Sequence, residues 1–178
     1  FPALFMGARM GIPTCVHESN AVPGLTTKLI AGRATKMLVA FEESAKYYRH
    51  PERVEVVGMP VRKEFITTEK AAARKELGLD QRPLIVSAFG SQGAKVMNET
   101  IADMMPMEQA DGFPFHHSRA AGSFGKEWMP QRVKDHGVNL ENCPSIEMRE
   151  YIYNMPNLLA AADVVIGRAG SATCNEIA

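Results

Sequence analysis

Two apolar runs limit the folds that are open to this chain. Apolar residues follow one another almost without interruption at 84–89 (LIVSAF) and 164–167 (VVIG), instead of alternating with polar ones. Such runs are typical of strands buried on both faces of a parallel sheet. Parallel neighbours must be joined by a crossover, usually a helix. Segments of helical composition, residues 94–104 and 124–136, lie between the apolar runs. The sequence therefore predicts an α/β protein with parallel sheets wound by crossover helices.

The other expected elements are short. Strands are predicted at residues 14–17, 36–40, 54–57 and 113–117, and helices at 2–10, 24–34, 42–48, 69–77 and 171–178. Thr68 is predicted to cap the helix at 69–77, and Gly78 to end it. Residues 58–67 contain Gly58 and Pro60 and break the pattern, so we expect a domain boundary there.

Composition narrows the class of function. Lys plus Arg number 20 and Asp plus Glu number 20, so the formal net charge is zero. Nucleic-acid-binding proteins usually carry a basic excess, and we expect no nucleic-acid partner. No apolar run approaches the roughly 18 residues of a membrane-spanning helix. The three cysteines form no CxxC pair, and the adjacent His116 and His117 would face opposite sides of a strand. We therefore expect neither a metal nor another cofactor.

Two of the strands lead through a glycine loop into a helix. The loops are Gly90–Gly93 (GSQG) and Gly167–Gly170 (GRAG). Glycine lets a ligand approach the backbone, and a helix N-terminus attracts a phosphate. Ordinary tight turns have the same residues, so both interpretations stay open. No GxGxxG, GxxxxGK[ST] or DxD motif occurs, which disfavours a dinucleotide-dependent dehydrogenase, a P-loop NTPase and a metal-dependent sugar transferase.

Several longer motifs go beyond a generic α/β protein. They are HESNAVPGLT at 17–26, GMPVR at 58–62, GSQGA at 90–94 with Asn98, YI at 151–152, and RAGSAT at 168–173 with Glu176. In this order and spacing they resemble the MurG family of bacterial glycosyltransferases. The resemblance implies a GT-B fold, two Rossmann-like domains facing across a cleft. Residues 1–62 would be the later part of the acceptor-binding domain, and 63–178 most of the UDP-GlcNAc-binding domain.

The resemblance also implies an activity and its partners. The enzyme would move GlcNAc from UDP-GlcNAc to undecaprenyl-linked lipid I with inversion, making lipid II for peptidoglycan. It would lie peripherally on the cytoplasmic face of the bacterial plasma membrane and serve cell-wall synthesis, cell shape and division. Two other functions stay open: another GT-B enzyme, such as a glycolipid synthase, and a non-catalytic nucleotide-binding module.

Site residues follow from the same resemblance. Asn20 would line the cleft near the donor sugar, and the guanidinium of Arg62 would suit a diphosphate. His17 and Glu18 are weak candidates for the base, with structural roles as their alternatives; the family's usual His would precede Phe1. The donor contacts would be Gly90, Ser91, Gln92 and Gly93 at the diphosphate, Ile152 at the uracil, and Ser171, Ala172, Thr173, Cys174, Asn175 and Glu176 beneath the nucleotide, with Glu176 accepting from the ribose hydroxyls.

The chain departs from the family at a few places. Ser19 stands where the family usually has Gln, and Arg119 follows His116-His117-Ser118 where the family often continues with Gly. The chain also begins at Phe1 without an initiator Met and ends at Ala178 inside a predicted helix. We therefore expect an internal fragment in which both GT-B domains are incomplete.

The first prediction concerns this fragment. Catalysis needs donor and acceptor held together, and the resemblance assigns part of the groups that hold them to segments outside residues 1–178. We expect residues 1–178, expressed alone and supplied with UDP-GlcNAc and a lipid I analogue, to show no GlcNAc transfer while an active family member assayed in parallel does. Measurable turnover by the isolated chain would contradict the prediction.

Overall fold

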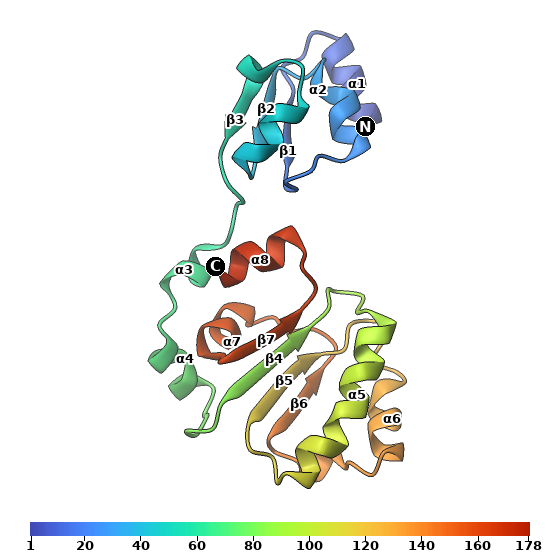
Figure 1. The fold of residues 1–178 in the computed structure, drawn as a ribbon, viewed down its shortest axis with the longest axis vertical. Helices are drawn as coiled ribbons and strands as arrows, with labels where there is room; N and C mark the ends of the chain where they lie inside the picture. Colours follow the sequence, from blue (N-terminus) through green and yellow to red (C-terminus); the bar gives the residue numbers. More distant parts are fainter. The chain divides into compact units, whose positions relative to one another are not determined.

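A computed structural model describes all residues, 1–178, and divides them into two compact units (Figure 1). The first unit comprises Phe1–Val61, Gly170–Glu176 and Ala178, and the second comprises Arg62–Ala169 and Ile177. Each unit contains one sheet, and every strand pair is parallel. The predicted class, α/β with parallel sheets wound by crossover helices, is confirmed. None of the helices has both the length and the apolar character needed to cross a bilayer.

The first unit is built on a three-stranded sheet in the order β1-β2-β3. Its strands are β1 (Cys15–Glu18), β2 (Lys36–Val39) and β3 (Val54–Val56). Helices α1 (Pro2–Arg9) and α2 (Leu25–Ala31) and two 3-10 helices, η1 (Glu42–Tyr47) and η2 (Pro51–Arg53), complete it. Its core is small and comprises Ala31, Ala34, Met37, Val39 and Tyr48.

The second unit has a four-stranded sheet in the order β6-β5-β4-β7. The strands are β4 (Leu84–Ala88), β5 (His116–Ala120), β6 (Ile146–Arg149) and β7 (Val164–Gly167). The chain moves outward from β4 to β6 and then returns to the other edge of β4. In open α/β sheets, ligands bind at the carboxyl ends of the strands beside such a reversal.

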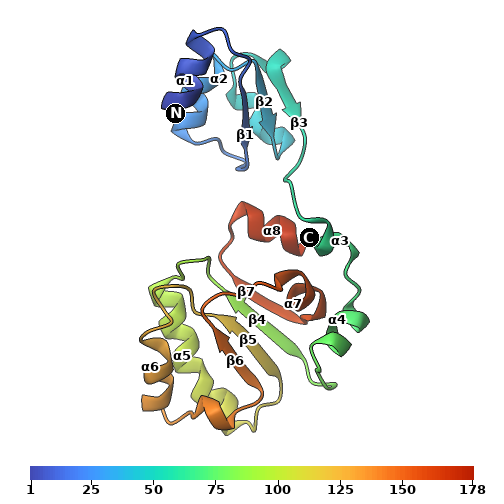
Figure 2. The same ribbon diagram turned by 180° about the vertical axis from the view of Figure 1, so that it is seen from behind.

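Helices cover both faces of this sheet (Figures 1 and 2). One side has α5 (Lys95–Ala110) and α6 (Met129–Asp135), and the other has α4 (Lys70–Glu76) and α7 (Met155–Ala161). The short helices α3 (Lys63–Thr67) and η3 (Leu140–Asn142) lie in the connections, and α8 (Ser171–Ile177) follows β7.

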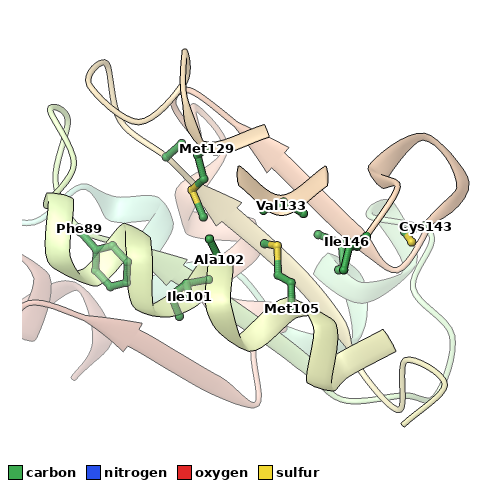
Figure 3. Close-up of a cluster of buried hydrophobic side chains, with 10 residues drawn as sticks. Phe89, Ile101, Ala102, Met105, Met129, Val133, Cys143 and Ile146 are labelled. Carbon is green, nitrogen blue, oxygen red and sulfur yellow. The ribbon is translucent and has the colours of Figure 1, made fainter. Parts of the chain in front are cut away.

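The two faces bury separate cores. The core under α5 and α6 is shown in Figure 3 and contains Phe89, Ile101, Ala102, Met105, Met129, Val133, Cys143 and Ile146 among others. The core under α4 and α7 contains Ala73, Leu84, Val86, Ala120, Ile152, Leu158 and Ala161. Strand β4 contributes Leu84 and Val86 to this second core, whereas Phe89, the residue after the strand, packs in the first core.

Several predicted boundaries are wrong. Thr68 ends helix α3 instead of capping the next one, because its hydroxyl donates to the Glu64 carbonyl. Helix α5 continues past residue 104 and through Pro106 to Ala110. A proline inside a helix costs about 3 kcal/mol, but Ala102 and Met105 are fully buried against the sheet. Their packing outweighs that cost.

The predicted elements after α5 also differ from those of the structure. The strand predicted at 113–117 is β5, which begins at His116, because Phe113 has a φ of 55° and cannot start a strand. The helix predicted at 124–136 begins only at Met129, with a proline in its first turn. Strand β6 and helix α7 were not predicted. The strand contains Glu147 and Arg149 and so lacks an apolar run.

The adjacent histidines of β5 face opposite sides of the sheet, as predicted. His116 Nε2 lies 2.9 Å from an Asp80 carboxylate oxygen. His117 lies on the α5 side, with Nδ1 2.9 Å from Glu108 Oε1 and Nε2 2.8 Å from the Ser87 hydroxyl. Arg119 continues the strand on the same side as His117, so no turn follows Ser118.

One carboxylate joins β7 to β4. Asp163 accepts from the Leu84 N–H at 2.8 Å, while its own N–H donates to the Leu84 carbonyl at 2.9 Å. Lys70 at 2.6 Å and Arg74 at 3.1 Å also donate to this carboxylate. The hydrogen bond from Lys70 lowers the pKa of Asp163, and the Leu84 N–H lowers it further. Asp163 therefore links helix α4 to both strands.

We expect Asp163→Asn to lower the free energy of unfolding by about 1 kcal/mol at pH 7, the typical value of one hydrogen bond. A depressed carboxyl pKa stabilises the folded state above about pH 3.9 and loses its effect as pH falls through the lower folded value. The difference between the two proteins should therefore shrink in acid. Urea unfolding at pH 7 and pH 3 measures it. Glu55→Gln, which breaks an exposed ion pair with Lys36, is the control and should change little. A constant difference across pH would rule out the charge as its cause.

Candidate functional site

The β4–α5 loop leads directly from a buried strand into the longest helix. Gly90 and Gly93 have φ values of 87° and 81°, and the Gly93 N–H donates to the Gly90 carbonyl. Ser91 and Gln92 are exposed at the tip. Helix α5 starts without a side-chain cap and without an acidic residue in its first turn. Its first N–H groups and the partial positive charge of the helix end are therefore available to an anion.

A second glycine loop, residues 121–125, supports the first. Its Ser123 and Phe124 N–H groups each donate at 3.1 Å, to the carbonyls of Ser91 and Gln92 respectively. This loop was not among the predicted site segments. Gly122 and Gly125 have the same GxxG spacing between strand and helix as the other two loops, and this spacing was the available signal. It was missed because β5 had been placed three residues too early.

The two loops touch so closely that side chains are excluded between them. A Cβ on Gly93 would lie 2.4 Å from the Ala121 carbonyl oxygen, and one on Gly122 would lie 2.2 Å from the Gly93 nitrogen. A Cβ on Gly125 would lie 2.3 Å from the same Ala121 oxygen. The side chain of Asn98 lies beside them and donates to that oxygen at 2.7 Å. Glycine is thus required here by contact within the protein, before any ligand is considered.

Two further segments leave the same edge of the sheet. After β6, the side chain of Ile152 is buried in the core, so only its backbone is available to a ligand. Tyr151 and Tyr153 flank it with their rings edge to face, 4.9 Å between centroids, and Tyr153 is 82% exposed. After β7, the chain passes through Arg168. Parallel pairing thus brings the carboxyl ends of all four strands to one edge.

Helix α8 contains the predicted residues 171–176. Its Gly170 cap provides no side chain, and the Cys174 N–H donates to the Gly170 carbonyl. The Asn175 side chain donates to the Ser171 carbonyl. Cys174 is an exposed free thiol, whereas Glu176 is half-buried. The nucleotide contacts assigned to Ser171, Ala172, Thr173, Cys174, Asn175 and Glu176 stay predictions.

The HESN motif of the first unit forms a turn held by Glu18. This carboxylate is 4% exposed and accepts from both the backbone and the side-chain nitrogen of Asn20, at 3.0 and 2.8 Å, and from the Gly24 N–H at 3.0 Å. Burial alone would raise the pKa of Glu18, but the N–H groups of Asn20 and Gly24 and the Thr27 hydroxyl lower it. Glu18 therefore orients the exposed Asn20 and is poorly suited to accept a proton.

The neighbouring predicted residues have simpler surroundings. His17 Nε2 lies 2.9 Å from the Gly58 carbonyl, so this nitrogen carries the proton. Arg62, at the start of the second unit, is exposed and stacks on Phe65 with 4.9 Å between the guanidinium carbon and the ring centroid. Burial, followed by the Glu18 charge, raises the pKa of Tyr48 to about 12.

Comparison with known proteins defines the class. The glycosyltransferase family 28 C-terminal domain matches residues 84–178, more than half of the chain. The chain therefore belongs to glycosyltransferase family 28.

Its relatives are more specific. Proteins from Desulforamulus reducens and Acetivibrio thermocellus, both named UDP-N-acetylglucosamine--N-acetylmuramyl-(pentapeptide) pyrophosphoryl-undecaprenol N-acetylglucosamine transferase, are 36% and 34% identical to it over 177 residues. These alignments cover 99% of this chain but 47% and 46% of the relatives. The chain thus spans about half the length of the relatives it matches.

Two solved structures are similar. The Acinetobacter baumannii MurG structure aligns with a TM-score of 0.63 and 26% identity, over 98% of this chain and 46% of that one. This likeness confirms the predicted GT-B class. A UDP-GlcNAc 2-epimerase from Neisseria meningitidis, bound to UDP-GlcNAc, aligns with a TM-score of 0.62 and 14% identity, over 95% of this chain and 51% of that one. At that identity the likeness concerns the fold alone.

If the β4–α5 loop binds UDP, as the family resemblance implies, Gly93→Ala should reduce UDP affinity at least tenfold, because its Cβ collides with the Ala121 carbonyl and moves the loop. Gly78→Ala is the matched control: Gly78 has a φ of 65°, but a Cβ there meets nothing within 4 Å. Both variants carry the backbone strain of about 1 kcal/mol, and only the first carries the collision. Calorimetry with UDP on variants of native circular dichroism compares them. Equal UDP affinity in the two would mean that the loop is only a turn.

Proposed function

We propose that this chain belongs to an enzyme that moves GlcNAc from UDP-GlcNAc to undecaprenyl-linked lipid I, forming lipid II. The observation that carries the proposal is the identity of 34–36% over 99% of the chain with transferases of that name. In this proposal residues 63–178 bind UDP-GlcNAc, and residues 1–62 belong to the acceptor-binding domain.

The donor diphosphate would bind at the β4–α5 loop. The exposed tip and the uncapped start of α5 present N–H groups, which satisfy phosphate oxygens and need no metal. The same N–H groups would stabilise the departing UDP as negative charge develops on it. The Ile152 backbone would read the uracil, the Glu176 carboxylate would accept from the ribose hydroxyls, and Arg62 would add a cation at the diphosphate.

The acceptor hydroxyl needs a base. The C4 hydroxyl of the muramyl sugar would attack C1 of GlcNAc, so its proton must leave as the new bond forms. Both Glu18 oxygens already accept hydrogen bonds, which makes it an unsuitable base. Glu18 instead holds Asn20, whose side-chain oxygen stays free to accept from a sugar hydroxyl. The base is therefore assigned to neither Glu18 nor Asn20.

The first unit has a surface suited to a membrane. Met6, Met10, Leu25 and Leu29 on α1 and α2 and in the turn after α1 are each at least half exposed. Arg33 stacks on Phe5 at 5.1 Å and, with Arg9 and Ala8, lines a shallow hollow beside them. Apolar side chains flanked by cations bind anionic bilayer surfaces. In the proposal that the enzyme lies peripherally on the cytoplasmic membrane surface, these side chains are the candidate contacts.

The donor proposal is tested at Glu176. A carboxylate that accepts from two ribose hydroxyls makes charge-assisted bonds worth about 1.5–3 kcal/mol each, so Glu176→Ala should weaken UDP binding by about tenfold to a hundredfold. Glu99→Ala, in the second turn of α5, serves as the matched control and should leave UDP affinity nearly unchanged. Calorimetry that shows unchanged UDP affinity in folded Glu176→Ala would contradict the ribose assignment.

A second measurement separates this function from its alternatives. Saturation-transfer NMR with UDP-GlcNAc, UDP-glucose and UDP-galactose should show preferred contact with the acetamido sugar. Preference for a different sugar would instead favour another GT-B enzyme. Binding of UDP without any contribution from the sugar would favour a nucleotide-binding module.

A further inference from the structure

Strand β5 places a charged side chain in the interior of the second unit. Arg119 is 0% exposed and lies on the α5 side of the sheet. Its Nη2 donates to Asn98 Oδ1 at 2.7 Å, whereas Nε and Nη1 have no hydrogen-bond partner. The guanidinium carbon lies 5.8 Å from the centroid of the Phe89 ring, which Figure 3 shows against α5. Burying an incompletely paired guanidinium opposes folding, so an apolar residue would fill this position at lower cost.

The surroundings of Arg119 keep it charged at neutral pH. Burial lowers its pKa to about 10, and the negative charge of Glu108 on α5 opposes that shift. Glu108 is itself held by His117, two residues before Arg119 on the same face. No ion pair joins Arg119 to a carboxylate, so its direct polar contact is the amide of Asn98.

This contact leads to the glycine loops. Arg119 occupies the oxygen of the Asn98 amide, so the nitrogen of the same amide must point to the Ala121 carbonyl, to which it donates at 2.7 Å. The Ala121 carbonyl is the atom against which Gly93 and Gly125 pack. Arg119 thereby selects the Asn98 orientation that brings loop 121–125 against the β4–α5 loop.

We propose that Arg119 is a positioning residue for the diphosphate-binding loop, acting through Asn98 and Ala121. The choice of UDP as ligand rests on the proposed function, whereas the ordering of the loops does not. Arg119 contacts no ligand, because it is wholly buried behind the loop. Replacing Arg119 should therefore weaken the binding of the phosphates. It should leave the binding of the nucleoside unchanged, because the proposed function assigns only the diphosphate to the Gly90–Gly93 loop.

The test compares Arg119→Met with Ser118→Ala in the full chain. Ser118 precedes Arg119 in β5, is also buried, and faces the opposite side of the sheet. We expect Arg119→Met to weaken UDP about tenfold, the effect of one charge-assisted hydrogen bond. Uridine affinity, measured by competition, should stay unchanged, and the unfolding temperature should not fall, because replacing a buried ion with an apolar residue is often neutral or stabilising. Ser118→Ala should leave both affinities unchanged.

Hydrogen exchange tests the ordering without a ligand. The Ser123 and Phe124 amides donate to the first loop, and in Arg119→Met they should exchange about tenfold faster while core amides of β4 stay protected. Arg119→Lys keeps a cationic donor, so its UDP affinity and its amide protection should lie between those of the unmodified chain and of Arg119→Met. If Arg119→Met does not fold, Arg119→Lys takes its place in both measurements. Equal loss of UDP and uridine binding, or unchanged exchange at Ser123 and Phe124, would overturn the proposal. If the unmodified chain binds no UDP, residues 63–178 do not form a donor-binding domain by themselves, and exchange at the Ser123 and Phe124 amides still decides the role of Arg119.

Discussion

Strand β4 is hydrogen-bonded along both edges, to β5 and to β7, and most of the second unit depends on that double pairing. Because all three strands run in one direction, their carboxyl ends meet at one edge of the sheet. Asp163 bonds to Leu84, the first residue of β4. The register between β7 and β4 is therefore fixed at the amino-terminal ends of the two strands. A loop that begins at the end of β4 therefore starts from one of the most constrained points in the chain.

The two faces of this sheet differ in chemistry. On the α4 and α7 side, β4 presents Leu84 and Val86 to an apolar core. On the α5 side, the same strand presents Ser87, which joins His117 and Glu108, and the next strand adds Arg119 with Asn98. A polar network has fixed directions, whereas an apolar core tolerates repacking. The face that leads to the glycine loops thus combines an apolar core with a hydrogen-bond network of fixed direction.

Much of the fold was predictable because local signals agreed with the final structure. The run at 84–88 was read correctly as a buried parallel strand, and the first unit follows the predicted alternation. Prediction failed where packing overrides local preference. Helix α5 passes Pro106 because Ala102 and Met105 are buried beside it, and β6 was missed because an edge strand with Glu147 and Arg149 lacks an apolar run.

The sequence by itself determined the class of fold, the β4–α5 loop and the family motifs, since these depend on short-range patterns of apolar residues, glycines and fixed spacings. Only the tertiary structure decided that loop 121–125 supports the first loop, that Glu18 is engaged with Asn20 and Gly24, and that Arg119 is buried behind Asn98. Each of these depends on atoms that lie far apart in the chain or on which side of a strand a residue faces. Strand register decides that side, and a shift of one residue would turn Arg119 to the opposite face.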